Sequence, residues 1–214
     1  MSLKTPPVLL LAFNRPETTT RVFEAIRRAR PARFFFACDG PRSGRPDEAV
    51  RVEAVRRMAE RVDWPCELNT RFLSENQGCG RGVSSAIDWF LREAGEGVIL
   101  EDDCLPTDEF FPYAAAMLER YRYDSRVGLI SGSNMAPEVE MPFDHGFSQI
   151  ASTWGWATWR RAWQHYDVRM AKWLDWSRSN KIAQCFHNDQ LAISYWRDAL
   201  DRVHQNGMDT WDYQ

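Results

Sequence analysis

The chain has 214 residues, of which 44% are hydrophobic and 27% are charged, and its formal net charge is −3, a balance typical of one globular domain. This charge argues against a nucleic-acid partner, because proteins that bind the phosphate backbone carry a basic stripe. No apolar stretch approaches the ~20 residues of a bilayer span and no signal peptide opens the chain, so the sequence predicts a cytoplasmic protein without a transmembrane segment, for which peripheral membrane association stays open.

Strands and helices alternate through the first half of the chain. Apolar runs bounded by turn residues predict strands, and Pro followed by acids at a helical apolar spacing predicts helix starts. The expected strands are 8–13, 33–38, 66–72 and 97–100, and the expected helices are 16–29, one opening at Pro46 and one following the loop 76–80. Such alternation predicts an α/β fold, with a mostly parallel central sheet flanked by helices in a single domain over residues 1–214.

Polar residues follow each expected strand. Asn14, Asp39, Asn76 and Asp103 stand where the four strands end. Because ligands of parallel sheets bind at the carboxyl ends of the strands, we expect these residues to converge on one crevice. Arg15 beside Asn14 could bind an anion, and Asp39 could accept a hydrogen bond from a ligand. The alternatives are a helix cap by Asn14 and an ordinary Asp-Gly-Pro turn at Asp39.

Three consecutive acids, Glu101, Asp102 and Asp103, end the fourth strand. Alternation along an extended segment would place Glu101 and Asp103 on one face and Asp102 on the other. Clustered carboxylates suit a hard divalent cation such as Mg²⁺ or Mn²⁺, with phosphate oxygens sharing its coordination. The alternative is a solvated acidic strand end without a ligand.

The loop that opens the third helix carries two glycines. Asn76, Gly78, Gly80 and Arg81 lie where exposed amides and the positive helix end would suit an anion. A lone Gly-x-Gly is weak evidence for such a site. We nevertheless expect Asn76, Gly78 and Arg81 to contact an anionic ligand.

The second half of the chain is rich in tryptophan and arginine. Aromatic faces offer stacking planes for sugars, and guanidinium groups could meet phosphates or acidic sugars. We therefore hypothesise that residues 152–163 form part of an acceptor site, that is, a binding site for a sugar-containing second substrate. The alternative is a core packed around tryptophan. The residues concerned are Trp154, Trp156, Trp159, Trp163, Trp173, Trp176, Arg160, Arg161 and Arg169.

Three segments together resemble nucleotide-sugar-dependent glycosyltransferases of the GT-A fold. They are VLLLAFNRP at 8–16, CDGP at 38–41 and LEDDCLPTDEFF at 100–111. The resemblance is to bacterial family 2-like enzymes and, more distantly, to the N-acetylglucosaminyltransferase I group. WDYQ at 211–214 is similar to the W-D-D-W segment that carries the catalytic base in that group, although Tyr213 replaces its second acid. The chain stops inside this segment, so we expect a part that closes over the donor to be missing.

The resemblance implies a metal-dependent transferase that moves a hexosyl or N-acetylhexosaminyl unit from a nucleoside diphosphate sugar, UDP-linked by expectation, to a hydroxyl of a glycan or another acceptor. Residues 1–130 would bind the nucleotide sugar and residues 131–214 the acceptor. Asp103 would bind Mn²⁺ or Mg²⁺, Asp102 would bind the ribose, and Glu101 would orient the donor hydroxyls or buttress the metal. Asn14 and Arg15 would line the nucleotide, with Arg15 screening the diphosphate, and Asp39 would accept a hydrogen bond from the base or ribose. Asp212 is the candidate base, and direct attack would invert the anomeric centre.

Two other functions stay open. A catalytically inactive sugar- or nucleotide-binding module would keep the tryptophans, but could lose the acids that are present here. A nucleotidyltransferase that makes the sugar nucleotide would be expected to carry a Gly-rich basic loop after the first strand. The segment FNRPE at 13–17 is not such a loop.

Overall fold

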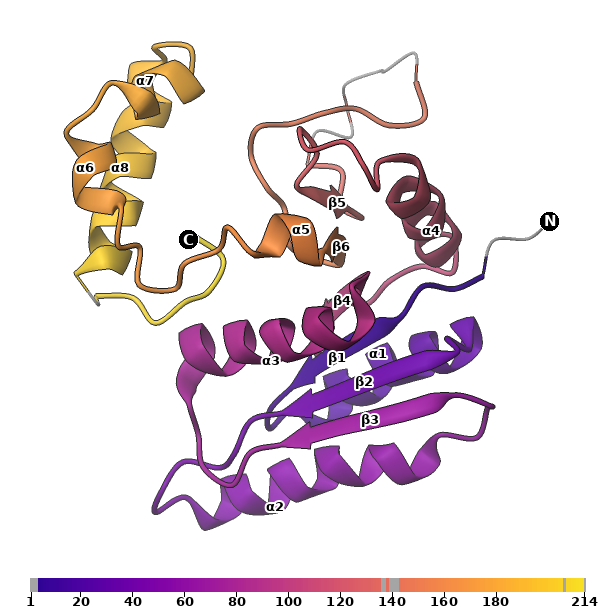
Figure 1. Cartoon of the computed structure of the whole chain (residues 1–214). Helices are drawn as coiled ribbons and strands as arrows, with labels where there is room; N and C mark the ends of the chain where they lie inside the picture. Colours follow the sequence, from indigo (N-terminus) through magenta and orange to yellow (C-terminus); the bar gives the residue numbers. More distant parts are fainter. Residues whose placement is uncertain (1–3, 136–137, 139–142, 206, 214) are drawn as a thin grey trace.

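The computed structural model describes residues 4–135, 138, 143–205 and 207–213, and its central sheet has six strands in the order β3-β2-β1-β4-β6-β5 (Figure 1). β1 to β4 are parallel to one another, whereas β6 runs antiparallel to both β4 and β5. The expected α/β class and mostly parallel sheet are therefore confirmed. The strands are β1 (Val8–Ala12), β2 (Arg33–Cys38), β3 (Glu67–Phe72), β4 (Glu96–Glu101), β5 (Leu129–Ser131) and β6 (Trp156–Trp159).

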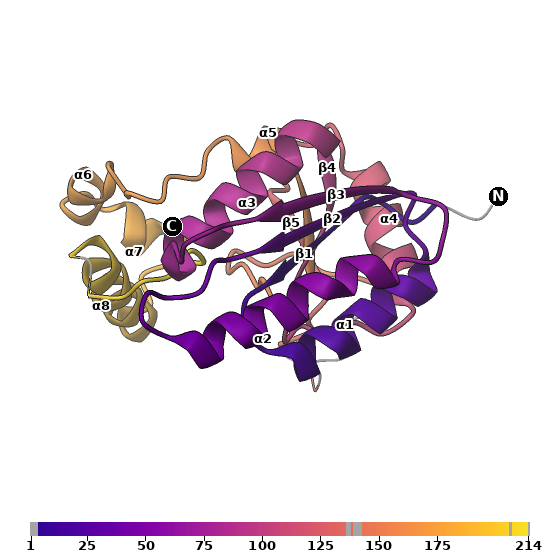
Figure 2. The same cartoon turned by 90° about the horizontal axis from the view of Figure 1, so that it is seen from below.

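Helices cover both faces of the sheet. They are α1 (Pro16–Ala29), α2 (Pro46–Arg56), α3 (Gly78–Ala94), α4 (Phe110–Arg120), α5 (Arg160–Trp163), α6 (Trp173–Ser177), α7 (Lys181–Cys185) and α8 (Gln190–His204), with a 3₁₀ helix η1 (Arg57–Arg61) after α2. Proline occupies the first helical turn of both α1 and α2, where its missing N–H leaves no hydrogen bond unmade. In Figure 2, α1 and α2 lie on one side of the sheet and α3 on the other.

Alternating strand residues build two cores. Leu10 and Phe36 face α1, α2 and α4, whereas Leu9 and Phe35 face α3. All four side chains are fully buried. Because both faces are covered, β1 and β2 read as continuous apolar runs rather than as alternating patterns.

The tryptophan-rich segment contributes a strand that the sequence did not lead us to expect. Trp156 and Trp159 lie on β6 and are 3% and 2% exposed. The indole N–H of Trp159 donates to the carbonyl oxygen of Leu118 at 3.2 Å. Arg161 stacks over the Trp159 ring at 4.2 Å and donates to three backbone carbonyl groups. These three side chains therefore support the alternative interpretation, a packed core, and not an acceptor surface.

Helices α6 to α8 form a small lobe with its own core, at the upper left of Figure 1. Its buried residues are Met170, Trp173, Ile182, Ile193 and Val203. The chain then returns to the sheet, where Trp211 stacks on Trp156 with ring centroids 5.6 Å apart. This contact ties the C-terminal segment to the core beneath α3.

The strand order reverses between β1 and β4. From β1 the chain passes outward through β2 to β3, and α3 then carries it back to β4 on the other side of β1. The loops after β1 and β4 lie side by side at this point, where Arg15 bonds Asp102 and Asp103, and this is the usual place for a ligand in such sheets. Within the described residues, no helix has the length and apolar character needed to cross a bilayer.

Candidate functional site

A cavity of about 370 Å³ opens where the strand order reverses between β1 and β4, which we call the switch point. It is lined by residues from the carboxyl ends of β1, β2 and β4 and from the first turns of α3. Its lining mixes apolar and charged side chains. The apolar part includes Leu11, Ala37, Val83 and Ala86. The polar part includes Arg15, Asp39, Asn76, Glu101, Asp102 and Asp209. Of the residues proposed from the sequence, Arg15, Asp39, Asn76, Gly78, Glu101 and Asp102 all line this one cavity.

The acidic segment is a turn rather than a continued strand. β4 ends at Glu101, and the N–H of Cys104 donates to the carbonyl oxygen of Glu101 at 3.0 Å. One guanidinium group, that of Arg15, bonds Asp102 through Nη2 and Asp103 through Nη1, the latter at 3.0 Å. The prediction that Asp102 and Asp103 would point to opposite faces is therefore wrong, because strand alternation stops at Glu101.

Burial raises the pKa of two acids at this site, Asp102 and Glu101. Asp102 is 2% exposed, and burial raises its pKa although the Arg15 guanidinium opposes the shift. Burial, and then the charges of Asp103, Asp102 and Asp212, raise the pKa of Glu101 to about 7. Charged carboxylates crowd this site, and one further cation would stabilise them.

The carboxylates partly fit a divalent cation. Asp102 Oδ2 is buried and has no hydrogen-bond partner among the described residues. Asp103 is about half exposed, so a ligand can reach it. Within the described part of the chain, no group of three acidic, histidine or cysteine side chains could hold a metal by itself. This pattern matches Mg²⁺ and Mn²⁺ sites in which one or two carboxylates act together with substrate phosphates.

Asp39 joins the end of β2 to the loop before α3. Its carboxylate accepts hydrogen bonds from the N–H of Gly40 at 2.8 Å, the N–H of Gln77 at 3.0 Å and the side-chain amide of Asn76 at 3.0 Å. A carboxylate offers about four acceptor positions, so little of its capacity is left for a nucleotide. Burial raises the pKa of Asp39. Its clearest role here is to shape the loop that borders the cavity.

The first turn of α3 already holds an anion, the carboxylate of Asp209. Its two oxygens accept from the N–H groups of Cys79 and Gly80 at 2.9 and 2.8 Å. A Cβ atom on Gly78, where φ is +78°, would lie 2.5 Å from Asp209 Oδ2. The sequence correctly indicated an anion-binding turn, but it gave no sign that a residue 130 positions away would occupy it.

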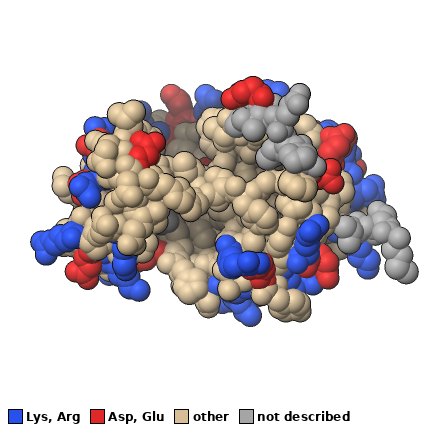
Figure 3. Space-filling model, turned by 90° about the horizontal axis from the view of Figure 1, so that it is seen from above, with Lys and Arg blue, Asp and Glu red and all other residues tan. Residues whose placement is uncertain are grey.

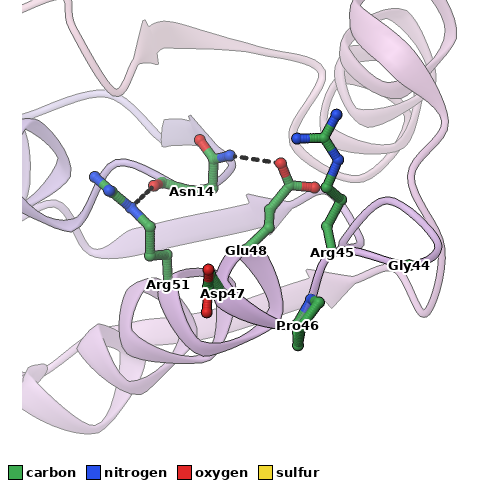
Figure 4. A pocket seen from close by; sticks show the side chains of 7 residues that line it. All are labelled: Asn14, Gly44, Arg45, Pro46, Asp47, Glu48 and Arg51. Atoms are coloured by element: carbon green, nitrogen blue, oxygen red, sulfur yellow. Dashed lines mark hydrogen bonds between the residues drawn. The ribbon is translucent and has the colours of Figure 1, made fainter.

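Asn14 and Arg81 do not line this cavity. Asn14 borders a separate pocket of about 490 Å³ beside the start of α2, where its side-chain amide donates to Glu48 Oε2 at 3.0 Å (Figure 4). Its carbonyl oxygen accepts from Arg51 Nε at 2.9 Å. The structure thus supports neither the nucleotide contact nor the helix cap for this side chain, since α1 begins after Arg15. Arg81 is exposed on α3.

Asp212 lies beside the cavity without lining it. It is exposed and accepts a hydrogen bond from the Thr210 hydroxyl. Its charge is close enough to Glu101 to contribute to the raised pKa of that group. Trp211, which is 4% exposed, fixes the backbone next to it. The final residue of the motif, Gln214, lies outside the described residues.

Sequence reasoning missed two arginines of the cavity. Arg42 follows the turn after β2, and its guanidinium lies 5.7 Å from the Phe13 ring centroid. Arg71, on β3, donates to Ser85 Oγ at 3.1 Å. Together with Arg15 they bring three positive groups to the cavity. The available signal was their position at strand ends, the same signal that singled out Asp39 and Asn76.

Comparison with known proteins gives no family. No protein-family model matches the sequence, and no curated protein matches it either. The function of the chain is therefore inferred from the residues and geometry of the cavity, and from the resemblance of three sequence motifs to GT-A glycosyltransferases.

The raised pKa of Glu101 predicts a stability change with pH. The unfolded chain loses this proton near pH 4.5 and the folded chain near 7, so the folded state is favoured at low pH and loses stability as pH rises between these values. We expect the loss to be roughly 2–3 kcal/mol and Glu101→Gln to remove it. Urea unfolding in chelator from pH 4.5 to 7.5 measures this. Parallel curves for the two proteins would contradict the assignment.

Proposed function

We propose that the chain is a metal-dependent glycosyltransferase of the GT-A type that transfers a sugar from a nucleoside diphosphate sugar to an acceptor hydroxyl with inversion. The observation that supports it most is the switch-point cavity. Three arginines, four carboxylates, of which that of Asp102 is buried, and an apolar wall line one space at the carboxyl ends of parallel strands. This is the combination that a nucleotide with a charged diphosphate requires.

The cavity divides into parts that suit the two ends of a nucleotide. The apolar wall from Leu11, Ala37 and Val83 suits the face of a base. Arg15 and Arg71 offer guanidinium groups to phosphate oxygens. The apolar wall and the arginines do not select among nucleotide bases. UDP is therefore expected only because of the motif resemblance.

A divalent cation would be held by Asp103 and by the free oxygen of Asp102. When bound, it would stabilise the negative charge that develops on the diphosphate as the sugar leaves. Arg15 bonds both carboxylates. We infer that it turns from them to the diphosphate when the donor binds, because it is the one cation that contacts both acids in the described structure.

The acceptor hydroxyl must lose its proton as it attacks the sugar. Asp212 is our candidate for the base, since it is exposed beside Glu101 and can approach an acceptor from solvent. Glu101 lines the cavity and would orient donor hydroxyls. Attack from the side opposite the diphosphate inverts the anomeric carbon.

Of the tryptophans suggested for the acceptor site, Trp154 is the best placed, because it is 74% exposed. We expect Trp154→Ala to weaken acceptor binding at unchanged UDP affinity and stability. Trp176→Ala, on α6 and 40% exposed, is the matched control. The buried Trp156 should behave differently, with Trp156→Ala costing about 3–5 kcal/mol of stability. Unfolding curves and acceptor titrations separate the two roles, and an unchanged acceptor affinity of Trp154→Ala would remove it from the site.

The alternative is a catalytically inactive nucleotide-binding module. The hydrogen bonds of Asp209 to the first turn of α3 favour this alternative, because a carboxylate of the protein itself occupies the N–H groups that could bind a phosphate. A panel of UDP, GDP, CDP and dTDP sugars, incubated with Mn²⁺ and glycan acceptors, distinguishes the two. Release of a nucleoside diphosphate with a glycosylated product supports the transferase. Binding without turnover of any donor would support the module, and no binding at all would remove both.

A further inference from the structure

The C-terminal segment 207–213, here named the strap, contacts the cavity at one point and the core at another. Asp209 lines the cavity and holds the first turn of α3. Two residues later, Trp211 is buried against Trp156. The strap is thus anchored by Trp211, two residues after Asp209.

Asp209 fills the anion position completely. It takes the N–H groups of Cys79 and Gly80, which point out of the helix start and carry its positive dipole end. Its oxygens also lie 2.5 and 2.8 Å from where Cβ atoms on Gly78 and Gly80 would stand. A phosphate group cannot bind the same N–H groups while this carboxylate remains.

Asp209 lies close to other acids. Cys79, at the same turn, has a pKa raised to about 11 by burial and by the charges of Glu101, Asp209 and Asp212. The strap therefore brings two acids close to the acidic turn after β4. A diphosphate that arrives with a divalent cation neutralises this charge, whereas Asp209 adds to it.

We propose that the strap is an autoinhibitory contact, in which Asp209 occupies the position of an incoming diphosphate and must leave before that diphosphate binds. The identity of the anion as the donor's diphosphate rests on the proposed function. The exclusion itself rests on the hydrogen bonds of Asp209. Diphosphate binding and the seated contact of Asp209 then exclude each other, so each weakens the other.

The affinity for pyrophosphate tests the proposal without turnover. If the strap is seated in about 90% of molecules, its removal raises the apparent affinity about tenfold. We expect Asp209→Ala to bind Mn²⁺-pyrophosphate about tenfold more tightly than the wild type in calorimetry. Asp189→Ala is the control, because Asp189 caps α8 with the same chemistry and does not line the cavity. Equal or weaker binding by Asp209→Ala would overturn the proposal.

Hydrogen exchange of the wild type gives a second readout that needs no variant. Saturating pyrophosphate should speed amide exchange at 207–210 while exchange at Cys79 and Gly80 stays slow, because the new anion replaces the old acceptor. Unchanged exchange at 207–210 with pyrophosphate bound would also overturn it. If Asp209→Ala binds pyrophosphate more tightly but neither protein transfers sugar, only the proposed function is contradicted. If both proteins transfer sugar and have equal affinity for the donor, only the strap proposal is contradicted.

Discussion

Asp212→Asn is expected to lower turnover by roughly 10²–10⁴ while donor affinity stays nearly unchanged. A base acts on the acceptor proton only during transfer, so its loss affects the transition state and not the bound donor. The position of Asp212 supports this separation, because it is exposed and does not line the cavity. Rapid-quench turnover and nucleotide calorimetry on the same protein samples measure the two quantities.

The control for this variant is Asp189→Asn. Asp189 accepts from the N–H groups of Leu191 and Ala192 at the start of α8, and an Asn side-chain oxygen can cap the helix in the same way, so this exchange of acid for amide does not approach the cavity. It should leave both stability and rate nearly unchanged. Wild-type turnover of Asp212→Asn would exclude Asp212 as the base. A parallel fall in rate, donor affinity and stability would instead assign it a role in positioning the strap.

Asp103→Asn is expected to abolish the dependence of UDP binding on Mn²⁺. The amide oxygen that replaces the carboxylate is neutral, and Asp103 is the exposed acid of the turn that a cation can reach with its phosphate ligands still attached. Without the cation, the diphosphate faces Glu101 and Asp102 directly, and repulsion reduces its affinity. Calorimetry with and without Mn²⁺ measures the difference.

Asp108→Asn is the matched control. Asp108 lies five residues further on, is exposed, and pairs with Arg28 at 2.9 Å. Loss of such a surface pair changes stability by at most about 1 kcal/mol. The Mn²⁺ dependence should survive this substitution. If Asp108→Asn removed the dependence and Asp103→Asn kept it, the metal ligand would have been assigned to the wrong acid.

Local patterns were sufficient to predict the parallel part of the fold. Pro16 and Pro46 open helices in the structure as expected, and the run that ends at Cys38 is a buried strand. These features depend on neighbours within a few residues, so the sequence carries them directly. The convergence of Asp39 and Asn76 was equally accessible, because parallel strands present their carboxyl ends at one edge.

Non-local features could not be predicted in the same way. Trp156 was considered as part of a binding surface, yet it lies in β6, which pairs antiparallel with β4 and β5. The residues near Trp156 in the sequence do not predict this pairing. Asp209 meets α3 across 130 residues. The failure at Asn14 has another cause, since Glu48, a buried acid on α2, competes for its amide. In each case, contacts with residues distant in the sequence determine the role of the side chain, and local sequence patterns do not.

The face shown in Figure 3 carries Lys and Arg interspersed with Asp and Glu, without a continuous basic stripe. The cavity itself is lined by Arg15, Arg42 and Arg71, of which Arg15 pairs with Asp102 and Asp103, and Arg42 pairs with Glu48. This distribution agrees with a small charged ligand better than with a long polyanion.

Calorimetric titration of the wild-type protein with UDP, in Mn²⁺ and again in excess chelator, tests the central claim most directly. The claim is that the switch-point cavity binds a nucleoside diphosphate through a cation on the acidic turn. We predict measurable binding in Mn²⁺ and an affinity at least tenfold lower in chelator, because the bare acids repel the diphosphate. Equal affinity under both conditions, or no binding under either, would contradict it.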